Sequence, residues 1–440
     1  MSTEPGVKVD HSTANRWMRH FVPIGDKTVM PWWKSSNKHT HWLWERPRLF
    51  VTLAAMIVAN GMTKSVLQPY LPVLAVDHMG ISVTNFGILV VVSALVSTVL
   101  TVYFGYLADK VRSKKGLIVI ASCVGAVAYG ATWVSGNIIV FVLLVTLFIP
   151  LSVSVFYQIF SLSRHLYLGA GKEAANNASI ALRGAFTLSW IVGPPISGIV
   201  ADRMGISTTL AVSMFAAALC ASIGIAGLPK ENTRSSEKTA MERPTEGFTL
   251  AYVKNPRVIY GVIAICLIEA ALQTHSMMLG MFMTRQLSNT VASIGIVYGI
   301  LACLEILMLP LVLMLSRRVK LEYALSLYCI MYAAYLSLIG DTTSFYSICL
   351  LQILNAAAIS GLYGLMIVWS QNLIEERPGL STSLYAVAEI VGATIASAIF
   401  ASTASHNLFR AGFWSAAGLC LIAALLTAGA PVLMRRPSPR

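Results

Sequence analysis

Charged residues are scarce in this sequence of 440 residues. Only 12% of its residues are charged, whereas 56% are hydrophobic. A soluble protein would carry about a quarter charged residues. It would also have to bury nearly every side chain, which the surface area of a folded chain of this size does not allow. The scarcity of charge therefore excludes an ordinary soluble protein.

Cysteine pairs and catalytic motifs are missing as well. The seven cysteines lie in or near apolar segments and none belongs to a Cys-x-x-Cys pair, so neither a disulfide framework nor a metal site is expected. No glycine-rich phosphate-binding loop precedes a helix, and the polar segments are too short for a nucleotide-binding domain. We therefore expect no cofactor, and a function other than catalysis.

The apolar residues are gathered into segments long enough to span a bilayer, which takes about 20 residues each. The twelve segments are 49–74, 84–108, 115–134, 137–160, 177–201, 207–228, 257–283, 291–315, 321–340, 343–370, 380–404 and 408–433. The sequence thus predicts an all-α integral membrane protein with twelve transmembrane helices. Such a chain has the lipid bilayer as its solvent.

The formal charge of +13 is distributed unevenly about these segments. With the N-terminus in the cytoplasm, 27 of the 32 Lys and Arg residues fall on cytoplasmic segments, and Arg203, Arg285 and Arg410 fall outside. Lys64 and Arg183 lie within spans. This asymmetry follows the positive-inside rule. It predicts that both termini are cytoplasmic and that the basic excess requires no nucleic-acid partner.

A polar segment after the sixth apolar block indicates two six-helix halves. The predicted parts are a cytoplasmic tail (1–48), a first bundle (49–228), a cytoplasmic linker (229–256), a second bundle (257–434) and a cytoplasmic C-terminus (435–440). A shift of 205 residues superimposes Lys64 on Glu269, and a shift of 206 superimposes Arg183 on Glu389. Transporters built from two parallel repeats bind their substrate between the halves.

The segment that links the second and third spans carries a spaced set of glycine, acidic and basic residues. It contains Gly105, Asp109, Lys110 and Arg112, followed by Lys114 and Lys115. This pattern resembles the cytoplasmic signature of the major facilitator superfamily of secondary transporters. Glycine permits close approach of helices, and an acidic residue can pair with basic groups in one of two alternating states. Gly105, Asp109 and Arg112 are therefore gating candidates.

Further stretches resemble the sugar efflux transporter family. They are Arg183 followed by Trp190-x-x-Gly193-Pro194-Pro195, then Leu304-Glu305-Ile306, and then Leu351-Gln352-x-x-Asn355-Ala356 continuing to Trp369-x-Gln371. The resemblance covers roughly residues 60–400. It implies proton-coupled efflux of sugars or glycosides across the cell inner membrane by alternating access. It also implies that spans 1, 4, 7 and 10 line the cavity. We expect the protein to function as a monomer.

Polar residues recur at helical spacing on several predicted spans, and such a stripe must face protein or water because lipid offers no hydrogen-bond partners. The substrate-binding candidates are Asn60, Lys64, Gln68, Arg183, Trp190, Glu269, Gln273, Gln352 and Asn355. Their many donors and acceptors suit a polyhydroxylated ligand. Trp190 and Trp369 are candidates for stacking on a sugar ring.

Ionisable residues within spans are functional candidates because a charge at the bilayer centre costs about 2.5–3.5 kcal/mol. They are Lys64, Arg183, Glu269, Glu305 and Glu389. If each cation pairs with a carboxylate, one Glu is left over, and an unpaired carboxylate in an apolar site tends to hold a proton. Glu305, Glu269 and Glu389 are therefore the proton-coupling candidates. Glu305 comes first because its repeat-equivalent position, Leu100, offers no cation.

Two other functions fit the same sequence. Lys64, Glu269 and Glu389 lie outside the sugar efflux pattern, and Gly193-Pro194-Pro195-x-x-Gly198 is similar to a signature of drug–proton antiporters. An exporter of another small polar metabolite, a siderophore or a drug is thus the alternative. A membrane receptor or sensor on a transporter scaffold is a third hypothesis.

Overall fold

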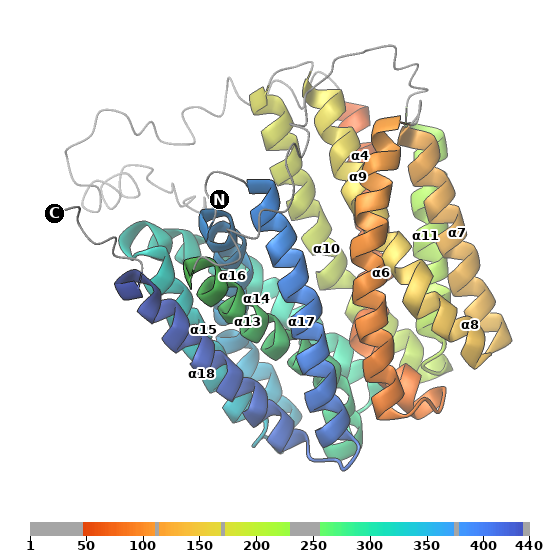
Figure 1. The fold of residues 1–440 in the computed structure, drawn as a ribbon. Coiled ribbons are helices and arrows are strands. Elements are labelled where there is room, and N and C mark those ends of the chain that lie inside the picture. The colour runs from red at the N-terminus through yellow and green to blue at the C-terminus, as the bar shows by residue number, and fades with distance from the viewer. Residues whose placement is uncertain (1–46, 111–113, 169–171, 229–255, 374–377, 434–440) are drawn as a thin grey trace, which may run out of the picture. The chain divides into compact units, whose positions relative to one another are not determined.

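The structure is a computed structural model that describes residues 47–110, 114–168, 172–228, 256–373 and 378–433 (Figure 1). Within these residues every regular element is helical, and twelve helices are long and apolar enough to cross a membrane. The prediction of an all-α membrane protein with twelve spans is confirmed. Nearly all of the predicted N-terminal tail and of the predicted linker, and the whole predicted C-terminus (435–440), lie outside the described residues.

Six spans lie in residues 47–228, which we call the first helical group. They are α4 (Pro47–Ser65) with η1 (Gln68–Tyr70), α5 (Leu71–Val73) and η2 (Leu74–His78); α6 (Val83–Lys110); α7 (Lys114–Ser135); α8 (Ile138–Leu143) with η3 (Leu144–Phe148) and α9 (Ile149–Leu168); α10 (Lys172–Met204); and α11 (Thr208–Gly227). The first span changes helix type near Pro69 and Pro72, because proline lacks the backbone N–H that an α-helix needs.

The second helical group, residues 256–433, contains the other six spans. They are α13 (Pro256–Met281) with η4 (Phe282–Gln286), α14 (Val291–Arg318), α15 (Leu321–Ile339), α16 (Phe345–Leu373), α17 (Pro378–Ala404) and α18 (Phe409–Leu433). Each group has extensive contacts of its own, such as α7 with α11 and α15 with α18.

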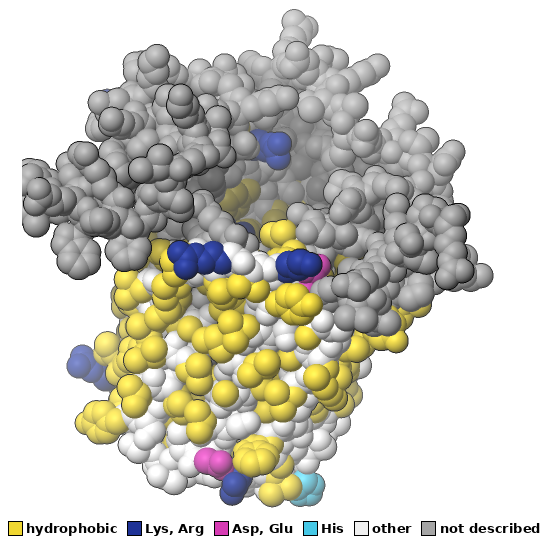
Figure 2. Space-filling view, turned by 90° about the vertical axis from the view of Figure 1, so that its left-hand side faces the viewer, with side chains coloured by type: hydrophobic (Ala, Val, Ile, Leu, Met, Phe, Trp, Pro, Cys, Tyr) yellow, Lys and Arg dark blue, Asp and Glu magenta, His cyan; other side chains and the backbone are white. Residues whose placement is uncertain are grey.

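Large hydrophobic side chains cover much of the outer surface. Val99, Phe215 and Leu425 are each more than three-fifths exposed, whereas Phe282 and Phe409 are fully buried. Figure 2 shows one face with a broad band of hydrophobic side chains and with charged side chains mainly towards its ends. A continuous apolar surface of this extent is unfavourable in water but matches the hydrocarbon of a bilayer.

The two groups contact each other mainly through α10 with α14 and α6 with α17 (Figure 1). A methyl group at Gly295 of α14 would collide with the carbonyl oxygen of Pro194 in α10. The rings of Phe86 and Phe400 join α6 to α17 with centroids 5.9 Å apart. These contacts lie where spans 5 and 11 end and where spans 2 and 8 begin. We call this the joined end.

Lys115, in the first turn of α7, also stabilises the first group. The Nζ atom of Lys115 donates to the carbonyl oxygens of Ile225 and Leu228, at 2.9 and 2.5 Å. These carbonyls lie at the C-terminus of α11 and have no helical partner of their own. The lysine charge also complements the negative end of the helix dipole.

Candidate functional site

Glu269 of α13 is buried, with 5% of its surface exposed. Its Oε1 accepts a hydrogen bond of 2.7 Å from the hydroxyl of Tyr385 in α17. The two helices approach closely here, because a methyl group on Gly392 would meet the Cβ atom of Glu269 at 2.6 Å and the backbone nitrogen of Ala270 at 2.9 Å. This packing fixes the carboxyl group of Glu269 against the tyrosine.

Lys64 lies near the middle of the first span, and its side chain is exposed. The charge acting on its ammonium group comes from Glu389 of α17, which is also exposed. The amide of Gln273 donates to the backbone carbonyl of Glu389 at 3.3 Å. Charged groups at this depth avoid lipid, so we expect Lys64 and Glu389 to face the interior between the helical groups.

Arg183 of α10 is exposed, and its charge acts on the half-buried Glu305 of α14. The structure therefore supplies Glu305 with a cation that the repeat comparison did not foresee. Glu269 instead has a tyrosine partner, and the charge that acts on it is a second carboxylate, Glu389. Glu269 thus differs from Glu305 in having a tyrosine hydroxyl, rather than a cation, as its neighbour.

Three further candidates belong to the first helical group. Asn60 is buried and donates to the carbonyl oxygen of Ser152 at 3.3 Å. Trp190 packs against the hydrophobic core. The Oε1 atom of Gln68, at the start of η1, is buried without a hydrogen-bond partner in the described part of the chain. Of these three, Gln68 alone has a side-chain polar atom that is both buried and without a hydrogen-bond partner among the described residues.

Gln352 and Asn355 of α16 are fully buried inside the second group. Asn355 donates to the Oε1 atom of Gln352 at 2.8 Å, and Gln352 donates to the hydroxyl of Tyr335 at 3.3 Å. The Nε2 atom of His275 lies 2.7 Å from the same hydroxyl. This hydrogen-bond network joins spans 7, 9 and 10, and it keeps Gln352 and Asn355 buried within the second group.

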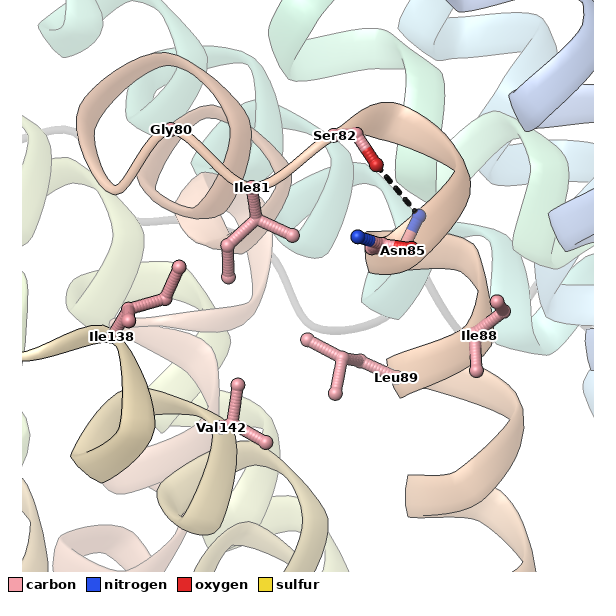
Figure 3. A pocket seen from close by; sticks show the side chains of 8 residues that line it. All are labelled: Gly80, Ile81, Ser82, Asn85, Ile88, Leu89, Ile138 and Val142. Carbon is pink, nitrogen blue, oxygen red and sulfur yellow. Dashed lines mark hydrogen bonds between the residues drawn. The ribbon is translucent and has the colours of Figure 1, made fainter.

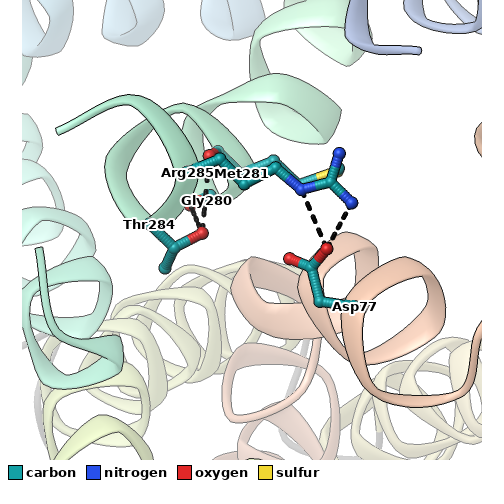
Figure 4. Close-up of polar contacts among 5 residues, drawn as sticks. All are labelled: Asp77, Gly280, Met281, Thr284 and Arg285. Carbon is teal, nitrogen blue, oxygen red and sulfur yellow. Dashed lines mark hydrogen bonds and ion pairs between the residues drawn. The ribbon is translucent and has the colours of Figure 1, made fainter. Parts of the chain in front are cut away.

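The gating candidates are described only in part. Gly105 and Asp109 lie in the last turns of α6, and Arg112 lies outside the described residues. At the joined end, however, Arg285 of η4 forms an ion pair with Asp77 of η2, and its Nε donates to Asp77 Oδ1 at 2.8 Å (Figure 4). Sequence analysis missed this pair, although opposite charges at the ends of spans 1 and 7 were the available signal.

Two tyrosines were also missed. Tyr157 of α9 and Tyr363 of α16 are 50% and 42% exposed. Both lie near Glu389, and Tyr157 also lies near Arg183. Their positions differ by 206 residues, the shift that superimposes Arg183 on Glu389. That shift was the signal that sequence reasoning overlooked.

A separate cleft of about 340 Å³ lies beside the connection between spans 1 and 2 (Figure 3). Its walls are mainly apolar, formed by Ile81, Ile88, Leu89, Ile138 and Val142. The backbone N–H of Asn85 donates to Ser82 Oγ at 3.2 Å, as expected at the start of α6. Because no ionisable side chain lines the cleft, it is a poor site for a polar substrate. No cluster of potential metal ligands occurs among the described residues.

Twelve spans in two groups, with ionisable side chains inside the spans, are typical of a secondary membrane transporter. The sequence model of the Major Facilitator Superfamily matches residues 53–342. The chain therefore belongs to the Major Facilitator Superfamily, which confirms that it is a transporter rather than an enzyme.

Curated relatives refine this likeness. The chain is 26% identical to Sugar efflux transporter C of Escherichia coli over 383 residues, covering 85% of this chain and 95% of that protein. It is 24% identical to Sugar efflux transporter A of Dickeya chrysanthemi over 395 residues, covering 87% and 94%. The predicted resemblance to sugar efflux transporters is confirmed.

Solved structures support the fold. The nucleoside transporter NupG matches with a TM-score of 0.73 and 13% identity, over 88% of this chain and 100% of that one. A bacterial homologue of the lysosomal transporter Spinster matches with a TM-score of 0.67 and 12% identity, over 90% and 99%.

Proposed function

We propose that this transporter exports sugars or glycosides across the inner membrane in exchange for protons and functions as a monomer. The observation that carries the proposal is the match to sugar efflux transporters along most of both chains. The exposed polar and aromatic groups between the helical groups are consistent with a polyhydroxylated substrate.

Alternating access requires two states that open to opposite sides. With both termini in the cytoplasm, as the basic residues favour, the joined end faces outward. The contacts of α10 with α14 and of α6 with α17 then close the outer side. The described conformation corresponds to the state that receives substrate from the cytoplasm.

Proton coupling is assigned to Glu269. A buried carboxyl group that lies close to a second carboxylate is costly to ionise, because an unpaired charge in an apolar site is unfavourable. With Glu269 protonated, Lys64 and Arg183 of the first group face Glu305 and Glu389 of the second, and the interior charges balance. Binding and release of one proton thus changes the attraction between the two groups.

The test uses purified protein in proteoliposomes with an imposed proton gradient and a panel of radiolabelled pyranosides and lactose. The wild type should accumulate at least one sugar against its gradient. Glu269→Gln should abolish gradient-driven accumulation but retain exchange of sugar for sugar. Glu322→Gln, at the start of α15, is the matched control and should behave as the wild type. Undiminished accumulation by Glu269→Gln would remove that residue from the coupling role.

The alternative substrate is an anionic metabolite, because Lys64 and Arg183 are both exposed in the interior. Arginine offers a fixed fork of donors that fits a carboxylate. For a neutral sugar, Arg183→Lys should weaken binding by about 1–1.5 kcal/mol, a typical net hydrogen bond. For an anion the loss should be larger and should grow with the charge of the substrate.

A further inference from the structure

Tyr157 and Tyr363 occupy equivalent places in the two helical groups. Tyr157 lies in the fourth span and Tyr363 in the tenth, 206 residues later. About half of each side chain is exposed, although each lies well within its span. Exposure alone does not distinguish a lipid-facing tyrosine from one that faces the interior, so the neighbouring charges must decide.

Both tyrosines have charged neighbours on other spans. Tyr157 is within electrostatic reach of Arg183 and Glu389, which come from spans 5 and 11. Tyr363 is within reach of Glu269, Glu305 and Glu389, which come from spans 7, 8 and 11. Because ionised groups at this depth avoid lipid, their presence beside both tyrosines favours an interior position for the two phenol rings.

An exposed aromatic ring beside charged groups is suited to a ligand with both an apolar and a polar face. The negative face of the phenol ring attracts polarised C–H groups, and one face of a pyranose ring presents such C–H groups while its edge carries hydroxyls. The nearby carboxylates and guanidinium group can then bind the hydroxyls. The tryptophans expected to stack are less accessible, since Trp369 is 2% exposed and Trp190 packs against the core.

We propose that Tyr157 and Tyr363 are the ring-stacking residues of the substrate site, one from each helical group, and that they select cyclic sugars over open-chain polyols. The inference rests on the proposed sugar efflux function. A ligand held by one ring from each group contacts both moving parts of the transporter, so its binding favours a state in which the groups have closed around it.

The test measures the half-saturating concentration of whichever methyl pyranoside the wild type transports best, with sorbitol as an open-chain competitor. Tyr157→Leu and Tyr363→Leu should each raise that concentration roughly tenfold. Tyr157→Phe and Tyr363→Phe keep the ring, so they should stay within about threefold of the wild type. Competition by sorbitol, which has no ring face, should be the same in all variants.

Tyr103→Leu and Tyr346→Leu are the controls, because these tyrosines are exposed at 56% and 82% near the ends of α6 and α16. Both variants should leave the half-saturating concentration of the pyranoside unchanged. Monodisperse Leu variants with wild-type half-saturation would overturn the inference, as would Phe variants that are as defective as Leu variants. A wild type that transports no sugar would overturn the proposed function itself, whereas sugar transport that is indifferent to both tyrosines would overturn only the stacking role.

Discussion

The ion pair between Asp77 and Arg285 should control how often the outer side opens. The two residues belong to different helical groups, and their side chains are 30% and 29% exposed. The pair therefore forms only while the joined end is closed. Exposed pairs contribute about 0.2–1 kcal/mol, and hydrogen bonds to charged groups about 1.5–3 kcal/mol. For a partly exposed pair with two such bonds to one oxygen, we estimate from these ranges that the pair stabilises the closed joined end by about 1–1.5 kcal/mol.

Asp77→Asn should consequently raise the ratio of outward-open to inward-open molecules by roughly five- to tenfold. The assay is the distance distribution between spin labels on Ser135→Cys and Thr343→Cys, in a background without the native cysteines. Both positions are exposed and close to the outer ends of spans 3 and 9. The variant should show a larger population at the longer distance.

Asp341 and Arg410 provide the matched control. Their side chains form an ion pair at 2.6 Å and are 42% and 65% exposed, but both belong to the second helical group. Asp341→Asn should therefore leave the distance distribution unchanged. Two results would refute the reasoning: an unchanged distribution for Asp77→Asn, or a shift of equal size for Asp341→Asn. The charge exchange Asp77→Arg with Arg285→Asp should restore much of the wild-type distribution.

Three further predictions concern contacts elsewhere. Gly392→Ala should separate α13 from α17, cost about 1–3 kcal/mol by overpacking, and lower both the Tm in detergent and the rate of transport; a wild-type Tm would contradict the close approach. Lys115→Met removes two hydrogen bonds from the end of α11, so the free energy of unfolding should fall by about 1–2 kcal/mol, measured by thermal unfolding beside Lys320→Met as a control. Tyr385→Phe removes the hydroxyl partner of Glu269, so fewer protons should move per sugar in a proteoliposome flux assay, and an unchanged ratio would rule out a role in coupling.

Twelve spans could be predicted from the sequence because the bilayer sets a minimum length for each apolar segment. The helix ends could not be predicted, because the length of an apolar segment reflects the thickness of the bilayer, and a helix can extend beyond it. α10 begins at Lys172, five residues before the apolar segment, and includes polar residues such as Asn176. The first span continues to His78 through a π-helical turn, past the segment predicted to end at 74.

The sequence indicates which residues of the spans are candidates for the site, but it does not indicate the partners of their side chains. A polar stripe on a span must face protein or water, and this rule does not say which of the two. Gln352 and Asn355 are buried and form hydrogen bonds, Asn355 to Gln352 and Gln352 to Tyr335, whereas the side chains of Lys64 and Glu389 are exposed. The choice depends on how each helix is rotated against its neighbours, and side-chain packing determines that rotation.

The partners of the interior charges bear on whether these charges are structural or functional. Lys64 and Arg183 lie in the first helical group, whereas Glu269, Glu305 and Glu389 lie in the second. A pair inside one rigid group contributes the same energy in every state, so it stabilises the fold and does not affect transport. A pair between the groups contributes an energy that changes as they separate, because the attraction falls with distance and with hydration. Neutralising Lys64 or Arg183 should therefore shift the equilibrium between the two states more than it lowers the stability of either.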